Sequence, residues 1–149
     1  MSRITCRTEP VSDADAERLA NLRVEAMRPS LEAVGRFDPV RARERFLDGF
    51  VAADTCIIQV EGSIAGFLVV RRRADHFYLD HLYVSPAFQG RGIGRDIIEG
   101  LKAEANAAGL PIRLMALNGS PANAFYLSCG FRFVSQDALD TIYIWTPGA

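Results

Sequence analysis

The chain of 149 residues has the length of one ordinary domain, and 49% of its residues are hydrophobic. That is enough apolar material for a sizeable core, so the composition excludes an intrinsically disordered chain and a disulfide-stapled miniprotein. The 17 basic and 18 acidic side chains leave a formal net charge of −1, so no bulk field attracts nucleic acid or an anionic membrane.

The three cysteines, Cys6, Cys56 and Cys129, are widely spaced and form no Cys-x-x-Cys pair. Only two histidines accompany them, so a zinc site lacks ligands and no metal is expected. Free thiols in a reducing compartment are the expected state. The first residues have no apolar stretch of signal-peptide length, and the longest apolar run, Ile64–Val70, is far too short to span a membrane. We therefore expect a cytoplasmic protein with one domain over residues 1–149.

The first third of the chain predicts one strand and two helices. Ile4–Glu9 is a candidate first strand. Ser12 offers the N-cap of a capping box for the first helix, and Pro29 is expected to end that helix. The pair Asp38-Pro39 then repeats the start signal, with an N-cap followed by proline at the first helical position.

The middle of the chain changes to strand patterns. Thr55–Val60 and Ile64–Val70 are β-rich runs separated by Glu61-Gly62-Ser63, which is a hairpin signal. A third run, Phe77–Val84, follows the arginine triplet at positions 71–73. Three adjacent strands with short turns predict an antiparallel meander, with the triplet at a solvated strand end or turn.

The last third predicts a longer helix, a buried strand, a short helix and two final strands. These are a helix from Ile93 that Gly109 ends, Ile112–Leu117, Pro121–Ser128, Phe131–Val134 and Leu139–Trp145. The predicted order is β-α-α-β-β-β-α-β-α-β-β. The fold class is therefore α/β (α+β), a mixed central sheet with helices on both faces.

A glycine-rich turn joins the third strand of the meander to the longer helix. Gly90, Gly92 and Gly94 remove side chains there, so several N–H groups can point outward together beside the positive end of a helix dipole. Arg91 and Arg95 bracket the turn and can add charge-assisted contacts to a pyrophosphate. The alternative is a glycine-rich turn with no ligand.

Two familiar phosphate loops do not fit this turn. A P-loop needs Gly-x-x-x-x-Gly-Lys-Ser/Thr, and the only lysine, Lys102, lies too far along. A Rossmann fingerprint needs Gly-x-Gly-x-x-Gly within a βαβ unit, whereas here the third glycine comes one position early, Arg95 follows it, and the preceding strand belongs to a meander.

The segment Gln89-Gly90-Arg91-Gly92-Ile93-Gly94 instead resembles the acyl-coenzyme A pyrophosphate loop, Gln/Arg-x-x-Gly-x-Gly/Ala, of the GNAT superfamily of N-acetyltransferases. The resemblance continues upstream in Leu82–Pro86 and downstream in Asn118–Phe131. It implies one GNAT-like domain with about seven strands. It also implies that two central parallel strands, Phe77–Val84 and Ile112–Leu117, splay apart around the cofactor.

The resemblance implies acetyl-CoA as co-substrate, with the backbone of Leu82, Tyr83 and Val84 beside the pantetheine. Asn118 and Asn123 compete for a further cofactor contact, because neither has the family's usual spacing from the tyrosine. Tyr126 matches the tyrosine that protonates the departing thiolate. The pyrophosphate contacts implied are those of Gln89, Gly90, Arg91, Gly92, Ile93, Gly94 and Arg95.

The acceptor amine has to lose a proton before it attacks the thioester. Asp80 and His81 lie on opposite faces of the same strand, and a water is the third alternative; Asp80 is our choice of general base. We expect direct attack in a ternary complex by a primary amine of a small molecule. The alternatives are a protein or peptide amine, or a non-catalytic acyl-CoA sensor. A nucleotide-binding protein and a purely structural partner protein are further rivals.

Arginines also gather in and around the two N-terminal helices, where the family builds much of its acceptor pocket. A solvated helix face paired with nearby carboxylates explains this cluster better than a binding site does. The residues are Arg28, Arg36, Arg41, Arg43 and Arg45. A homodimer stays open, because Trp145 and Phe50 are apolar enough for a dimer contact or for the core.

Overall fold

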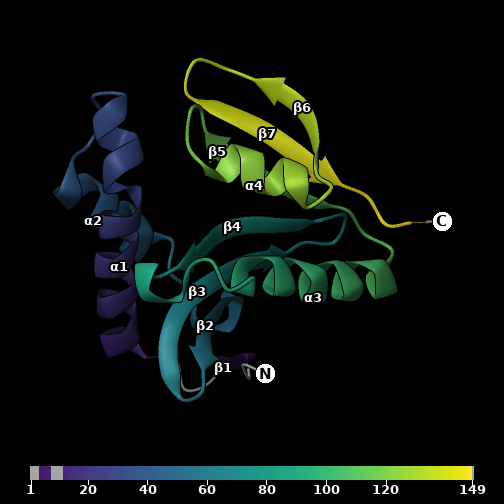
Figure 1. Cartoon of the computed structure of the whole chain (residues 1–149), viewed down its shortest axis with the longest axis horizontal. Helices are drawn as coiled ribbons and strands as arrows, with labels where there is room; N and C mark the ends of the chain where they lie inside the picture. Colours follow the sequence, from purple (N-terminus) through teal and green to yellow (C-terminus); the bar gives the residue numbers. More distant parts are fainter. Residues whose placement is uncertain (1–3, 8–11, 149) are drawn as a thin grey trace. The chain divides into compact units, whose positions relative to one another are not determined.

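The computed structural model describes residues 4–7 and 12–148 (Figure 1). The strands and helices follow one another in the predicted order, and the strands are hydrogen-bonded in the order β1-β2-β3-β4-β5-β7-β6. The sheet is mixed, as predicted, because β4 and β5 are parallel and the other pairs given below are antiparallel. The elements are β1 (Ile4–Arg7), α1 (Asp13–Ala33), α2 (Pro39–Asp48), β2 (Thr55–Val60), β3 (Ser63–Arg72), β4 (Phe77–Val84), α3 (Ile93–Ala108), β5 (Ile112–Leu117), α4 (Ala122–Ser128), β6 (Arg132–Gln136) and β7 (Asp140–Trp145).

The chain forms two compact units, and β3 and β4 each contribute to both. The first unit holds the described residues up to 69 together with 81–91. The second holds 70–80 and the described residues from 92 onward. A single domain over residues 1–149 stays a prediction.

In the first unit, β1 pairs antiparallel with β2, and β2 with β3. The predicted hairpin turn is confirmed: Glu61 and Gly62 both have positive φ, 51° and 83°, as a two-residue type I′ turn requires. Helices α1 and α2 lie side by side (Figure 1). Their apolar faces pack on the strands in a core of Leu19, Ala20, Phe46, Ile57, Phe67 and Val69, and Phe50 packs against this cluster.

Both predicted helix starts in this unit are confirmed. Ser12 accepts a hydrogen bond from the N–H of Asp15, whose side chain accepts one from the N–H of Ser12, which completes the capping box. The side chain of Asp38 caps α2 in front of Pro39. The predicted end of α1 at Pro29 is wrong, because α1 continues to Ala33. Proline has a φ compatible with helix and removes one hydrogen bond, which α1 tolerates.

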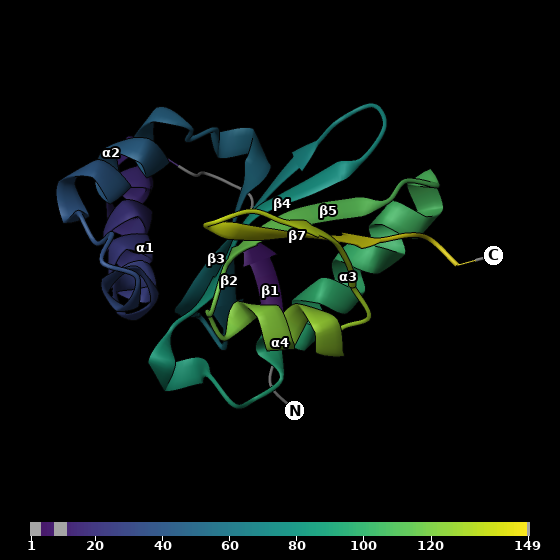
Figure 2. The same cartoon turned by 90° about the horizontal axis from the view of Figure 1, so that it is seen from above.

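In the second unit, β4 pairs parallel with β5 over Phe77–Leu79 and Ile112–Leu114, and β7 lies antiparallel between β5 and β6. Figure 2 shows β5 and β7 side by side with α4 on one face of them. Helix α3 connects the parallel strands and ends at Gly109, which has a φ of 69°, as its predicted role as C-cap requires. Ile98, Leu101, Ile112, Leu114, Tyr126, Phe131 and Tyr143 are buried in this unit.

Three other expectations change. Strand β1 ends at Arg7, and the rest of the predicted Ile4–Glu9 strand lies outside the described residues. Strand β3 extends through Arg71 and Arg72, which are not simply solvated, since each pairs with a carboxylate. Cys56 is disulfide-bonded, so free thiols were the wrong expectation there.

The structure describes Cys129 as a free and buried cysteine. Within the described part of the chain, every helix is too short or too polar to cross a lipid bilayer.

Candidate active site

The glycine-rich turn has the backbone that the sequence predicts at two of its three glycines. Gly90 and Gly92 adopt left-handed conformations, with φ of 79° and 76°. This region is costly for residues that carry a Cβ atom. Gly92 is also the N-cap of α3, and no side chain caps the helix there. The first N–H groups of α3 therefore face outward at the positive end of the helix dipole, an arrangement that suits an anion.

Gly94 serves a different purpose. A Cβ atom on this residue would lie 3.2 Å from Cζ of Phe125 on α4. Such a contact is tighter than ordinary van der Waals packing, so the absence of a side chain lets the Phe125 ring lie directly on the first turn of α3. Gly94 is thus a packing glycine between two helices.

Some side chains of the turn contact the rest of the protein, and others are exposed to solvent. Gln89 donates a hydrogen bond from Nε2 to the carbonyl oxygen of Val84 at 2.9 Å, which ties the start of the turn to the end of β4. Ile93 is buried, so only its backbone can face a ligand. The Arg91 guanidinium stacks over the Phe88 ring at 5.2 Å and is exposed, which leaves it accessible to an anion.

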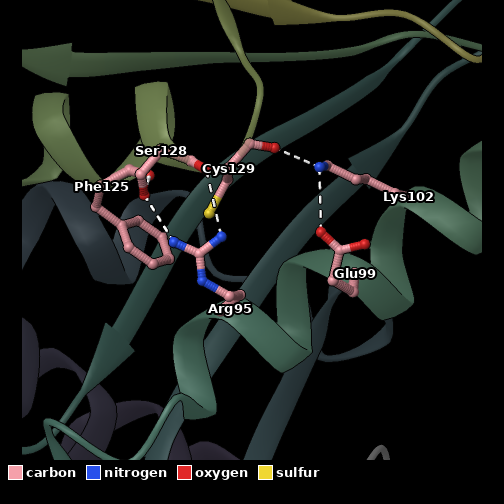
Figure 3. Close-up of polar contacts among 6 residues, drawn as sticks. All are labelled: Arg95, Glu99, Lys102, Phe125, Ser128 and Cys129. Atoms are coloured by element: carbon pink, nitrogen blue, oxygen red, sulfur yellow. Dashed lines mark hydrogen bonds and ion pairs between the residues drawn. The ribbon is translucent and has the colours of Figure 1, made fainter.

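Arg95, which is predicted to contact the pyrophosphate, has its guanidinium on α4. It donates to the carbonyl oxygen of Ser128 at 3.3 Å and to the Ser128 hydroxyl at 2.9 Å (Figure 3). Lys102, also on α3, donates to the carbonyl oxygen of Cys129. The sequence did not predict these roles for Ser128 and Lys102. The bonded residues are 33 and 27 positions apart in the chain, and a local pattern carries no information on contacts at that separation.

The strand segment predicted to bind pantetheine lies in the first unit. Leu82, Tyr83 and Val84 are half-buried. The Tyr83 ring meets the Phe67 ring edge-on at 5.8 Å, and burial, followed by the nearby Glu25 carboxylate, raises the pKa of the Tyr83 phenol. The backbone of this segment is the part that the resemblance assigns to the cofactor.

The two candidate bases are both engaged with arginines. Asp80 accepts hydrogen bonds from Nε and Nη2 of Arg71 at 3.1 and 3.0 Å. In the first unit, Nε of Arg23 donates to Nδ1 of His81 at 3.0 Å, and the His81 ring packs 5.2 Å from that of Phe46. Accepting at Nδ1 leaves the proton of a neutral imidazole on Nε2, so this tautomer of His81 is a donor, not a base, at that atom.

The two asparagines that compete for a cofactor contact both have extensive bonds within the protein. The Asn123 amide donates to the carbonyl oxygens of Leu117 and Ser120 at 2.9 and 3.0 Å, and its oxygen accepts from the Tyr143 hydroxyl at 2.8 Å. Asn118 holds the β6–β7 hairpin through Asp137, Gln136 and Thr141.

Tyr126 is a buried residue of α4, between the rings of Phe125 and Phe131, at centroid distances of 5.2 and 5.6 Å. Burial, followed by the neighbouring Cys129, raises the pKa of its phenol, so the phenol keeps its proton at neutral pH. Among the described residues, no hydrogen-bond partner of the Tyr126 hydroxyl is found. A buried, protonated hydroxyl without a partner is suited to donate to a bound ligand.

The glycine-rich turn and the tyrosine of α4 lie within residues 50–133, which match the family model of the acetyltransferase (GNAT) domain. This match covers more than half of the chain. The protein therefore belongs to the GNAT acetyltransferase family. Among curated protein sequences, none matches the chain.

Solved structures share the fold at low sequence identity. The PaiA N-acetyltransferase of Thermoplasma acidophilum, solved in complex with coenzyme A, is 16% identical, with a TM-score of 0.72 over 97% of this chain and 99% of that one. PH1933 of Pyrococcus horikoshii is 18% identical, with a TM-score of 0.75 over 99% and 100% of the two chains. The ribosomal-protein-S18-alanine N-acetyltransferase of Escherichia coli is 19% identical, with a TM-score of 0.68 over 100% and 96%.

Proposed function

We propose that this protein transfers the acetyl group of acetyl-CoA to a primary amine of a small-molecule acceptor. The observation that carries the proposal is the start of α3, where Gly90 and Gly92 have left-handed backbones and no side chain caps the helix. In a chain of the GNAT family, these outward N–H groups are the binding site for the diphosphate of the cofactor. Arg91 adds a charge-assisted contact.

Tyr126 is the general acid of the proposed reaction. The amine attacks the thioester carbonyl, the carbon–sulfur bond breaks, and the departing thiolate takes the phenolic proton. The phenol is protonated in the resting enzyme, so it has a proton to give. The role is further supported because no described residue hydrogen-bonds to the Tyr126 hydroxyl.

A water removes the proton of the attacking amine in this proposal. Of the three alternatives, Asp80 and His81 are both engaged with arginine side chains, Arg71 and Arg23. A water molecule can take the proton of the amine without disturbing either of these contacts within the protein.

A small acceptor is supported by the surface of the first unit. A depression of about 290 Å³ between α1 and α2 is lined by Asn21, Val24, Glu25, Pro39, Val40 and Arg43. Its volume is near the lower end for pockets that bind small molecules. Glu25 provides a carboxylate for an ammonium group, and Val24, Pro39 and Val40 provide apolar walls.

The test combines calorimetry with a free-thiol assay. Acetyl-CoA should bind, and a panel of small primary amines should include one that releases coenzyme A. Tyr126→Phe should lower kcat by about 10²-fold or more with an unchanged dissociation constant, while Tyr78→Phe, which removes a hydroxyl outside the proposed site, should leave kcat unchanged. Binding without thiol release across small amines and peptides would identify a sensor, and no binding at millimolar acetyl-CoA would reject the proposal.

A further inference from the structure

Helix α4, which carries Tyr126, is fastened to α3 at its C-terminal end by a chain of hydrogen bonds (Figure 3). The Arg95 guanidinium donates to the carbonyl and to the hydroxyl oxygen of Ser128, at 3.3 and 2.9 Å. The Ser128 hydroxyl in turn donates to the carbonyl oxygen of Phe125 at 2.6 Å. One arginine thus organises the last turn of α4.

A second cation from α3 reaches the same end of α4. Nζ of Lys102 donates to the carbonyl oxygen of Cys129 and pairs with Glu99 at 3.2 Å (Figure 3). It also lies 5.8 Å from the centre of the Trp145 ring. The side chain of Lys102 is only 16% exposed. Lys102 is the chain's only lysine, and these contacts hold it largely out of solvent.

These contacts help to set where α4 lies, because α4 has only seven residues. A helix of this length is not stable by itself and takes its position from its surroundings. Its final carbonyl groups carry the negative end of the helix dipole, where cations are favourable partners. Gly94, directly before Arg95, leaves room for the Phe125 ring of α4 beside the first turn of α3.

We propose that Arg95 and Lys102 are positioning residues that hold α4 so that the Tyr126 phenol is correctly placed, and that Arg95 is not a ligand of the diphosphate. The inference rests on the proposed function of Tyr126 as general acid. It revises the pyrophosphate contact that the charge and position of Arg95 beside the turn suggested. Its physical basis is that the guanidinium already makes two contacts with Ser128, two residues after the tyrosine.

The decisive experiment is a set of substitutions at both ends of the contact. Arg95→Met should lower kcat about tenfold and Ser128→Ala should lower it less, because the serine variant keeps the bond of Arg95 to the carbonyl oxygen of residue 128. The double variant should lose less than the product of the two single effects, because both remove the bond between Arg95 and the Ser128 hydroxyl. The dissociation constant of acetyl-CoA should stay within about twofold. Arg91→Met, the matched arginine of the same turn, should instead weaken acetyl-CoA binding.

A second comparison separates positioning from a general loss of structure. In the Tyr126→Phe background, Arg95→Met should cause no further loss of kcat, because the group that it positions is gone. Additional loss in that background would overturn the inference. So would a large rise in the acetyl-CoA dissociation constant for Arg95→Met with Ser128→Ala unaffected, since that result identifies a diphosphate ligand.

Hydrogen exchange of the ligand-free protein decides the inference independently of activity. The amides of Cys129, Gly130 and Phe131 donate to the carbonyls of α4. Arg95→Met and Lys102→Met should both speed their exchange, and Lys102→Arg should restore it. Unchanged exchange would overturn the inference, whereas a wild-type protein that transfers to no amine would overturn the proposed function alone.

Discussion

Arg71 binds Asp80 through two nitrogens on a single carboxylate oxygen, with Nε 3.1 Å and Nη2 3.0 Å from Oδ2. The pair joins the end of β3 to the middle of β4 within the second unit, and its side chains are 16% and 32% exposed. A second pair, Arg72 with Glu104, joins the same end of β3 to α3 but is 43% and 48% exposed. The two pairs therefore differ chiefly in burial.

Asp80→Asn should lower the free energy of unfolding by about 1–3 kcal/mol, because it removes a charged hydrogen-bond partner from a mostly buried guanidinium. Glu104→Gln should cost less than about 1 kcal/mol, since solvent screens the exposed pair. Urea unfolding measures both. The transfer rate of Asp80→Asn should stay within about tenfold of wild type. A loss of 10²-fold or more, with the acidic limb of the pH–rate profile removed, would instead assign Asp80 as the general base.

Two glycines offer a matched test of backbone packing. A Cβ atom on Gly66 in β3 would lie 1.8 Å from the carbonyl oxygen of Tyr83. Gly66→Ala should therefore cost more than about 3 kcal/mol or prevent folding, because backbone has to move. Gly100, on the exposed face of α3, has open space around it, and Gly100→Ala should stabilise the protein by about 0.5–1 kcal/mol. Equal melting temperatures for the two variants would contradict the described approach of β3 to Tyr83.

The sequence predicted those features that depend on residues close together in the chain. The caps at Ser12 and Asp38 and the turn at Glu61-Gly62 were all correct, because each depends on hydrogen bonds or φ values within four residues. The bounds of β2, β4 and β5 also agree with the prediction. Apolar runs bounded by turn residues are a local signal as well.

The sequence could not predict which partner each polar side chain chooses. Arg95 has a suitable position for a phosphate ligand, yet it binds Ser128, and this preference depends on how α4 packs. The asparagines were ambiguous for the same reason, since Tyr143 lies 20 residues from Asn123. Pro29 gave a wrong helix end. The rule that proline ends a helix is local and does not say whether α1 tolerates the loss of one hydrogen bond.

Asn123 should prove to be structural. Asn123→Ala leaves the Tyr143 hydroxyl and two backbone carbonyls without this partner, so it should cost about 1–3 kcal/mol in unfolding free energy. Combined with Tyr143→Phe, it should cost less than the sum of the two single changes, because they share one hydrogen bond. Asn106→Ala on the surface of α3 is the control and should change stability by about 0.5 kcal/mol at most. A stable Asn123→Ala protein with weakened acetyl-CoA binding would assign the residue to the cofactor.

The buried phenol of Tyr126 predicts a loss of stability in alkali. Its pKa in the folded protein is raised above the ordinary value of 10.0, so above that pH the unfolded chain releases the phenolic proton while the folded protein keeps it. The unfolded state then binds fewer protons, and the free energy of unfolding falls as pH rises, by at most about 1.4 kcal/mol per pH unit for this one group. Urea unfolding between about pH 9 and 11.5 should show a shallower fall for Tyr126→Phe than for wild type. Parallel curves for the two proteins would mean that the phenol ionises as readily in the folded protein as in the unfolded chain, which would contradict its burial in α4.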